Sequence, residues 1–138
     1  MEHSDLIGTQ ISALEQEIMQ KKQELYSLRK MESRFELQDY LLHDRWGSEL
    51  RLSDLFGGRD ELILVHNMGR ACPYCTLWAD GFNGLVSHLE SRAAFVVSTP
   101  DSVADMDAFA TGRGWKFRLV STQGTTLKKD LGFQLEDG

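Results

Sequence analysis

The sequence predicts an α/β fold with a parallel sheet, preceded by a long N-terminal helix. Two observations lead to this prediction. Beyond residue 60, short apolar runs alternate with segments of helical periodicity, which is the pattern of strands joined by crossover helices. Before residue 33, apolar residues recur at steps of three and four without any proline. We therefore expect two parts, a helical part over residues 1–33 and an α/β domain over residues 34–138.

Residues 5–32 are predicted to form a single helix whose apolar stripe approximates a heptad repeat. At a rise of 1.5 Å per residue this helix would be about 40 Å long, which is longer than a small domain needs. Two such helices could pair along the stripe, so a homodimer is expected. Packing of the helix on its own domain is the alternative. Lys21 interrupts the stripe, whose apolar members are Ile7, Ile11, Leu14, Ile18, Leu25 and Leu28.

The α/β domain is predicted to begin with a hairpin and to continue as alternating strands and helices. Residues 35–42 are expected to form a strand with Phe35, Leu37 and Leu41 facing inward, and residues 50–52 to pair back on it. In chain order, the elements expected next are a glycine-ended helical turn at 53–58, a strand at 61–67, a helix at 75–91, a strand at 93–98, a helix at 103–111, a strand at 115–120 and a short helix at 126–131.

Two of these elements carry more specific expectations. The strand at 61–67 is a continuous apolar run, which indicates burial on both faces, as in a parallel sheet. Gly81 and Gly84 weaken the helix at 75–91 and indicate a kink or a close backbone approach. The core face of that helix is predicted to consist of Trp78, Phe82, Leu85, Val86 and Leu89.

Composition and charge argue against several classes of function. The 138 residues are 41% hydrophobic and 26% charged, which is ordinary for a globular domain with its own core. A net charge of -6 argues against nucleic acid as the main partner, because phosphate binding requires a basic patch. No apolar run approaches the ~20 residues of a membrane span. The first residues show no signal peptide pattern. We therefore expect a cytoplasmic protein with no membrane association.

Both cysteines of the chain lie in one short loop, Cys72-Pro73-Tyr74-Cys75, between a predicted strand and a predicted helix. This spacing and place are typical of a dithiol redox site, since a helix N-terminus favours the thiolate and the two sulfurs can close a disulfide. Structural disulfides are rare in the cytoplasm, which favours a chemical role for the pair. We predict Cys72 and Cys75 as catalytic residues, with Cys72 as the nucleophile because its sulfur is closer to the helix start.

Three further side chains are candidate auxiliary residues. His66 and Arg70 could stabilise a thiolate, and Asp80 could accept a proton from the resolving thiol. The ordinary alternatives are a satisfied histidine at a strand end and two solvated surface charges. A zinc site made by the two cysteines with His66 and His88 is a weaker alternative, because no second Cys-x-x-Cys supplies ligands. We predict neither a metal nor a cofactor.

Several segments of the chain resemble a known superfamily. The general likeness lies in Leu52–Gly58, the apolar strand with the loop after it, Val97–Ser102 and Phe117–Ser121. The chain resembles the peroxiredoxin branch of the thioredoxin-like superfamily, which includes alkyl hydroperoxide reductase and thiol-specific antioxidant proteins. It is most similar to an uncharacterised bacterial thioredoxin-like family, through His66–Met68, Cys72–Cys75, Trp78–Phe82 and Gly114–Trp115. The likeness runs from about Glu24 to Phe133.

This resemblance implies a thioredoxin-like three-layer sandwich and a thiol–disulfide oxidoreductase or thiol peroxidase. The substrate would be a disulfide-bearing protein, a low-molecular-weight thiol or a peroxide. The roles of the cysteines stay open, because peroxiredoxins have threonine at the position of Cys72 and the peroxide-attacking cysteine at the position of Cys75. In thioredoxins the earlier cysteine is the nucleophile. A non-catalytic interaction module on the same scaffold is the contrasting hypothesis, because a fold alone does not establish an activity.

The resemblance also implies a sandwich that is incomplete at its C-terminal end. The superfamily continues with a cis-proline, a β-hairpin and a last helix, and peroxiredoxins add a downstream arginine, whereas the prolines here are Pro73 and Pro100 alone. Without that hairpin, Leu62 to Val65 would present an open apolar edge, which proteins rarely leave bare. We expect a second subunit, the 35–52 hairpin or the N-terminal helix to cover it.

Overall fold

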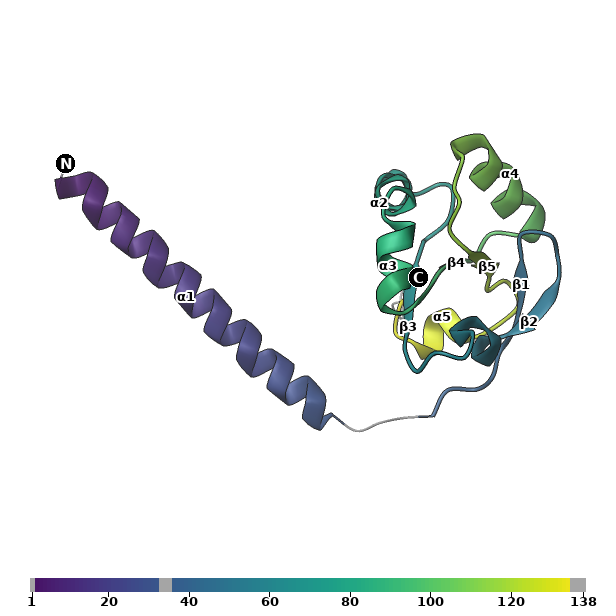
Figure 1. Ribbon diagram of the computed structural model, residues 1–138, viewed down its shortest axis with the longest axis horizontal. Coiled ribbons are helices and arrows are strands. Elements are labelled where there is room, and N and C mark those ends of the chain that lie inside the picture. Colours follow the sequence, from purple (N-terminus) through teal and green to yellow (C-terminus); the bar gives the residue numbers. More distant parts are fainter. Residues whose placement is uncertain (1, 33–35, 135–138) are drawn as a thin grey trace. The chain divides into compact units, whose positions relative to one another are not determined.

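The computed structural model describes residues 2–32 and 36–134, and the chain divides into two units (Figure 1). The first unit, residues 1–36, contains helix α1 (Glu2–Met31), in agreement with the predicted long helix. The second unit, residues 37–138, contains the mixed α/β fold. Within the described ranges, none of the helices combines the length and the hydropathy that crossing a bilayer requires.

The α/β unit is built on a mixed five-stranded sheet in the order β2-β1-β5-β4-β3. Strands β3, β4 and β5 run parallel, whereas β1 is antiparallel to both β2 and β5. The predicted hairpin therefore exists, but it joins the sheet through β5, at the opposite edge from β3. The strands are β1 (Leu41–Asp44), β2 (Glu49–Arg51), β3 (Leu62–His66), β4 (Ala94–Thr99) and β5 (Leu119–Ser121).

Helices cover both faces of this sheet and give the expected three layers (Figure 1). Helices α2, α3 and α4 pack on one face, around Phe95 and Val97 of β4. The short helical turn η1 and helix α5 pack on the other face, around Val96 and Val120. The helical elements of this unit are η1 (Leu52–Phe56), α2 (Pro73–Asn83), α3 (Val86–Arg92), α4 (Val103–Arg113) and α5 (Leu127–Asp130).

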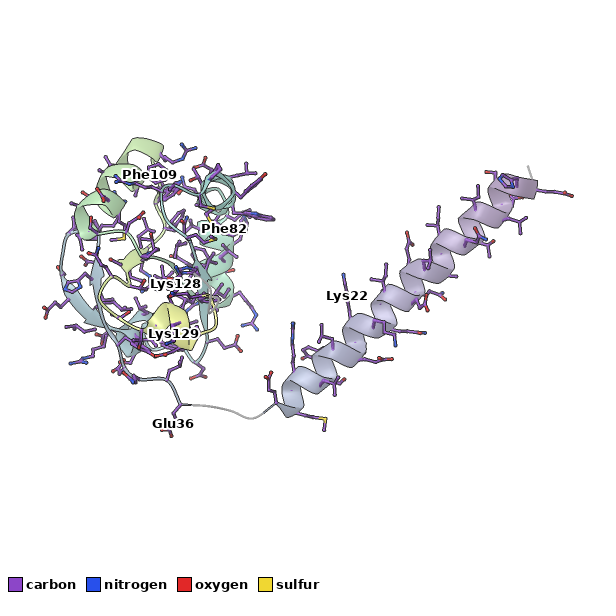
Figure 2. The ribbon with its side chains drawn as sticks, turned by 180° about the vertical axis from the view of Figure 1, so that it is seen from behind. Lys22, Glu36, Phe82, Phe109, Lys128 and Lys129 are labelled. Atoms are coloured by element: carbon purple, nitrogen blue, oxygen red, sulfur yellow. The ribbon has the colours of Figure 1, made fainter. Side chains whose placement is uncertain are left out.

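Aromatic side chains fill the layer between the sheet and helices α2 and α4. The ring of Phe82 meets Phe95 edge-on with centroids 6.0 Å apart, and Phe109 meets Trp115 in the same way at 5.3 Å. Phe82 and Phe109 come from different helices and lie on the same side of the unit (Figure 2). This aromatic layer holds α2, and hence the loop that precedes it, against the sheet.

Strand β3 packs on both faces, as its continuous apolar run predicts. Ile63 and Val65 contact the cluster under α2 and α4, and Leu62 and Leu64 contact the cluster under α5. Every residue of β3 is nevertheless half-buried rather than buried, because β3 is the edge strand of the described sheet. The hairpin pairs with β5 at the other edge, so of the three candidates for covering β3 the hairpin is ruled out.

The inward face predicted for the first strand is wrong by one residue. Leu37 and Leu41 are 39% and 38% exposed, whereas Tyr40 and Leu42 are buried. Successive side chains of a strand point to opposite faces, so a shift of one residue exchanges the two faces completely. The strand also begins later than predicted, at Leu41. Phe35, the third residue predicted to face inward, lies outside the described residues.

The predicted helix over residues 75–91 is two helices, α2 and α3, with the break at Gly84, where a kink was expected. Trp78 and Leu85 were predicted to be core residues, but they are 66% and 50% exposed. The buried residue of α2 is Ala79. Leu85 lies beyond the break at Gly84 and so does not continue the stripe of α2. Within α2 the core-facing side chains are those of Ala79 and Phe82, and Trp78 lies outside that face.

The predicted strand over residues 115–120 pairs with the sheet only from Leu119 onward. Trp115 and Phe117 are buried, as an apolar strand would suggest, but they lie in the connection after α4. The backbone N–H of Trp115 donates to the carbonyl of Ala110 and so continues the end of α4 rather than a strand ladder. Burial here comes from the aromatic layer, which sequence alternation alone does not distinguish from a sheet.

Candidate dithiol site

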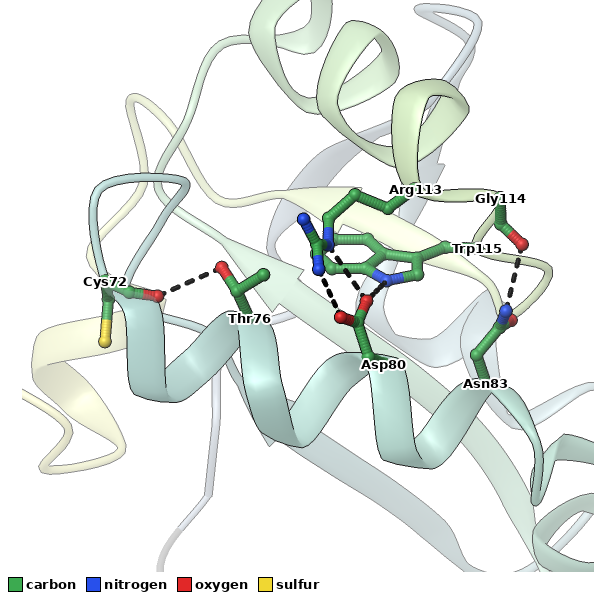
Figure 3. Close-up of polar contacts among 7 residues, drawn as sticks. All are labelled: Cys72, Thr76, Asp80, Asn83, Arg113, Gly114 and Trp115. Atoms are coloured by element: carbon green, nitrogen blue, oxygen red, sulfur yellow. Dashed lines mark hydrogen bonds and ion pairs between the residues drawn. The ribbon is translucent and has the colours of Figure 1, made fainter.

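The dithiol lies where β3 gives way to α2, as predicted. Cys72 is the N-cap residue of α2, and its Sγ accepts a hydrogen bond from the backbone N–H of Cys75 at 3.3 Å. Pro73 occupies the first helical turn, where no backbone donor is needed. The hydroxyl of Thr76 donates to the carbonyl of Cys72 at 3.1 Å (Figure 3). These local bonds hold Cys72 at the start of the helix.

The two thiols have opposite shifts in acidity. A hydrogen bond from the Cys75 side chain, followed by the Cys75 backbone N–H, lowers the pKa of Cys72. Burial, followed by its hydrogen bond to Cys72, raises the pKa of Cys75, against a weaker opposing bond from the N–H of Met68. Both cysteines are free and half-buried. The arrangement therefore favours a thiolate on Cys72 and a protonated thiol on Cys75.

The carboxylate of Asp101 stabilises the loop before the dithiol, and the sequence pattern did not identify it. Its Oδ2 accepts the backbone N–H of Arg70 at 2.9 Å, and its Oδ1 lies 2.9 Å from where a Cβ on Gly69 would stand. Gly69 has a φ of +111°, so glycine meets both the backbone and the space requirement at this position. The side chain of Asn67 adds a bond to the N–H of Gly69 at 2.8 Å.

Asp101 reaches this loop because it follows β4, the parallel neighbour of β3. The carboxyl ends of adjacent parallel strands meet at the same edge of a sheet, which brings the two loops together. The carbonyl of Asp101 accepts the hydroxyl of Ser121 at the end of β5, and the backbone N–H of Asp101 donates to the hydroxyl of Thr99 at 3.2 Å. The sequence pattern indicated only a turn around Asp101. The place of this turn directly after a parallel strand is the signal that could have located Asp101 at the same edge of the sheet as the dithiol.

His66 ends β3, but its contacts in the described residues are not with the sulfurs. Its Nδ1 lies 3.4 Å from the hydroxyl of Ser98, and its ring stacks on Phe133 with centroids 5.1 Å apart. Its Nε2 is buried and has no hydrogen-bond partner within the described ranges. Burial, and then the charge of Lys128, lower the pKa of His66. These contacts give no support to a role of His66 in stabilising a thiolate, but its unpartnered Nε2 also means that His66 is not the fully satisfied histidine of the ordinary alternative.

Arg70 and Asp80 also turn away from the sulfurs. The guanidinium of Arg70 pairs with Asp105 at 3.1 Å. Asp80 accepts hydrogen bonds from the guanidinium of Arg113 and from the indole N–H of Trp115, the latter at 2.7 Å (Figure 3). The bond from Arg113, followed by that from Trp115, lowers the pKa of Asp80 to about 2. So weak a base gives no support to the prediction that Asp80 accepts a thiol proton.

The contacts of Asp80 and Asn83 instead anchor α2 to the segment after α4. The amide of Asn83 donates to the carbonyl of Gly114 at 2.9 Å (Figure 3). Its oxygen accepts the backbone N–H of Lys116 at 2.6 Å. This tether fixes the direction in which the helix N-terminus, with Cys72, points. Asp80 and Asn83 thus position the dithiol through the helix rather than by contact.

The geometry does not support the zinc alternative. Within residues 2–32 and 36–134, no group of three or more histidine, cysteine, aspartate or glutamate side chains is placed to hold a metal ion. His66 contacts Ser98 and Phe133, and His88 is exposed on α3. The two thiols therefore lack the further ligands that tetrahedral zinc requires.

Comparisons with solved structures show which known proteins this fold is similar to. The fold is similar to that of peroxidoxin BcpB from Mycobacterium tuberculosis, with a TM-score of 0.53 and 30% identity over 62% of this chain and 55% of that one. Peroxiredoxin Q from Xanthomonas campestris gives a TM-score of 0.53 and 27% identity over 61% of this chain and 52% of that one. This chain thus spans about half the length of those peroxiredoxins.

A thioredoxin-like protein from Porphyromonas gingivalis shares the fold at a TM-score of 0.57, with 13% identity over 72% of this chain and 68% of that one. The fold is therefore thioredoxin-like and related to the peroxiredoxins, as the sequence resemblance implied. A family model described as "Bacterial protein of unknown function (DUF899)" matches residues 9–138, so the chain belongs to that bacterial family. A search of the curated proteins gave no match.

Proposed function

We propose that this protein is a thiol–disulfide oxidoreductase in which Cys72 is the nucleophile and Cys75 is the resolving thiol. The observation that carries the proposal is the place of Cys72 as the N-cap of α2, where its Sγ accepts the backbone N–H of Cys75 at 3.3 Å. The pKa of Cys72 is lowered there, whereas burial raises the pKa of Cys75. A lowered pKa increases the fraction of Cys72 present as the attacking thiolate at neutral pH. A raised pKa keeps Cys75 protonated until the second step needs it.

The reaction balances without a cofactor. The Cys72 thiolate attacks one sulfur of a substrate disulfide, so a Cys72–substrate bond forms, the substrate S–S bond breaks, and the departing thiolate takes a proton from solvent. Cys75 then loses its proton, and its sulfur attacks Cys72. The Cys72–Cys75 bond forms and the second substrate thiolate leaves. The dithiol is oxidised by two electrons and the substrate disulfide is reduced.

An exposed apolar surface beside the dithiol supports a protein as the substrate. Tyr74 is 76% exposed, and Leu77 and Trp78 on the next turns of α2 are also exposed. A surface pocket continues along this face of the helix, lined by Leu77, Trp78, Gly81, Phe82 and Leu85. Contiguous apolar side chains at the surface are typical of sites that bind other proteins, so we propose a disulfide-bearing protein as the preferred partner.

Peroxide reduction is a second candidate, favoured by the similarity to a peroxidoxin and a peroxiredoxin. In that reaction the thiolate attacks one peroxide oxygen, the O–O bond breaks, and the departing alkoxide takes a proton. The resulting sulfenic acid is then attacked by the other cysteine, which forms the disulfide and releases water. The acidity of the two thiols assigns the first attack to Cys72, whereas the sequence resemblance to peroxiredoxins would assign it to Cys75.

Two matched variants, Cys72→Ser and Cys75→Ser, test both proposals in the full chain. We expect Cys72→Ser to abolish reduction of a model disulfide, and Cys75→Ser to accumulate a mixed disulfide on Cys72 that intact-mass spectrometry detects. The same variants exposed to a hydroperoxide show which sulfur is oxidised first. If the wild-type dithiol reduces neither a disulfide nor a peroxide, the non-catalytic interaction module is the better description.

A further inference from the structure

We propose that α1 pairs with α1 of a second copy of this chain as a parallel, two-stranded coiled coil. The helix has an apolar stripe, and none of its residues is buried in the described structure. The six aliphatic side chains of the stripe are between 44% and 64% exposed. An amphipathic helix gains most of its stability by packing such a stripe, which calls for a partner surface of the same length. This proposal is independent of the redox function.

The stripe follows the spacing of a dimeric coiled coil. Its members alternate at steps of four and three, which places them at the a and d positions of consecutive heptads. Isoleucine fills two of the three a positions and leucine fills two of the four d positions, which is close to the combination that favours two parallel strands over higher oligomers. The a positions are Ile11, Ile18 and Leu25, the d positions are Ile7, Leu14, Lys21 and Leu28, and the outward f positions are the polar Thr9, Gln16, Gln23 and Lys30.

Charges beside the stripe favour the parallel orientation and a second copy of this chain. In a parallel dimer a g residue faces the e residue five positions later in the other helix. That rule brings Glu17 to Lys22 of the second copy, and Glu24 to Arg29 of the second copy, twice each by symmetry. An antiparallel pairing that keeps the stripes aligned would bring Glu17 to Glu24 and Glu15 to Lys22, so it would combine one unfavourable kind of contact with one favourable kind. Lys22 projects freely from α1, as this pairing requires (Figure 2).

Lys21 is the one charged residue in the stripe, and its geometry is compatible with the dimer. Its Nζ pairs with Glu24 of the same helix at 3.3 Å, so its charge is balanced beside the stripe. A single asparagine or lysine at an a position reduces coiled-coil stability but specifies the register and the number of strands, and we assign the same effect to Lys21 at its d position. In the aligned dimer the two lysines share one layer. A slip of one heptad would place each lysine against leucine and expose the ends of the stripe.

Disulfide trapping tests the orientation in the full chain. The background is Cys72→Ser with Cys75→Ser, so that an added cysteine is the only one in the chain. We expect Leu28→Cys to cross-link to itself under mild oxidation, because the d positions face each other in a parallel dimer. We expect a mixture of Ile11→Cys and Leu28→Cys chains to give little cross-linking between the two variants. Cross-linking only between the variants would mean an antiparallel pair and would overturn the proposal.

Sedimentation equilibrium tests the pairing itself. We expect wild type to be a dimer, and Ile11→Lys with Ile18→Lys to be a monomer; Gln16→Lys with Gln23→Lys is the matched control and should remain a dimer. Reversing Glu17 and Glu24 to lysine should weaken dimerisation about tenfold or more, and adding Lys22→Glu and Arg29→Glu should restore it. A monomeric wild type, or charge reversal without effect, would contradict the proposal. A trimer or a tetramer would also contradict it.

Discussion

The two halves of α2 are held in different ways, although they belong to one short helix (Figure 3). The first turn carries Cys72 and is bonded mostly to itself, through the N–H of Cys75 and the hydroxyl of Thr76. The second half is tied across the fold, since Asp80 and Asn83 contact the segment that follows α4. The reactive end therefore depends for its orientation on contacts made at the other end.

This difference suits a helix that presents a reactive thiol. The bonding of the sulfurs must change during each cycle, so strong contacts between them and the rest of the fold would have to break and re-form. A tether two turns away fixes the helix without taking part in the chemistry. We therefore predict that substitutions in the second half of α2 mainly lower the free energy of unfolding. Substitutions near its first turn should mainly change the reactivity of the thiols.

The largest effect on stability is expected from Asp80→Ala. The variant removes the acceptor of the Trp115 indole N–H, which lies in a buried ring, and leaving such a donor unpaired costs roughly 1–3 kcal/mol. The side chains of the Arg113–Asp80 ion pair are more than one-third exposed, so solvent screening makes the ion pair the smaller part of the loss. Urea denaturation of the full chain measures the sum. The exposed carboxylate variant Asp60→Ala should unfold like wild type, and equal losses in both variants would refute the tether.

The contribution of Asp80 should also depend on pH. Its pKa is lowered from 3.8 to about 2 in the folded chain, so folding favours the ionised form. The stabilisation is therefore fully present above about pH 4 and is lost as the pH falls through about 2. We expect the difference in unfolding free energy between wild type and Asp80→Ala to narrow over that range. A difference that stays constant down to about pH 2 would contradict the assignment.

An intermediate effect, on reactivity rather than stability, is expected from Asp101→Ala. The variant frees the N–H of Arg70 and loosens the turn at Gly69 that leads into the dithiol. We expect the rate of disulfide reduction to fall about threefold to tenfold, because the sulfur is less well positioned. Asp105→Ala is the matched control, since it removes only a surface pair with the Arg70 side chain. Equal rates for the two variants would show that Asp101 does not position the loop.

A smaller effect is expected from Cys75→Ala on the acidity of Cys72. The hydrogen bond from the Cys75 side chain is the main cause of the lowered pKa, so its removal should raise the pKa of Cys72 towards that of an ordinary thiol. The rate of alkylation of Cys72 as a function of pH measures this change. Cys75→Ser keeps a hydroxyl donor and should retain more of the shift. The same midpoint for both variants would assign the acidity to the helix N-terminus instead.

The smallest effect is expected from Thr76→Val, which preserves shape and removes the hydroxyl. The carbonyl of Cys72 keeps its bond from the Thr76 N–H at 3.1 Å, so little should be lost. We expect unfolding free energy to change by less than about 0.5 kcal/mol and the alkylation profile of Cys72 to stay as it is. Thermal and urea unfolding of Thr76→Val and Asp80→Ala, measured side by side, compare the stability contributed by the two halves of α2. If Thr76→Val lost as much unfolding free energy as Asp80→Ala, the two halves of α2 would not differ in how they are held.

The order of strands and helices was predictable where the chain carries strong local markers. Ser102 caps α4 by accepting the N–H of Asp105, and Gly114 ends that helix in the left-handed conformation, both as turn chemistry would suggest. Strand β4 is buried at every residue, which its continuous apolar run indicates. The faces were less predictable, since burial of Leu42 rather than Leu41 depends on a register set by partner strands.

The sequence by itself determined that Cys72 and Cys75 lie together at a strand-to-helix junction, because spacing, helix capping and the preceding apolar run are all local properties. Only the tertiary structure decided what surrounds them. Asp101 reaches the loop from 31 residues further along the chain, and Trp115 reaches Asp80 from 35. The tertiary structure also placed the hairpin at the edge of the sheet away from β3. Contacts between distant segments depend on how the layers pack, and the pattern of a single segment carries no record of that packing.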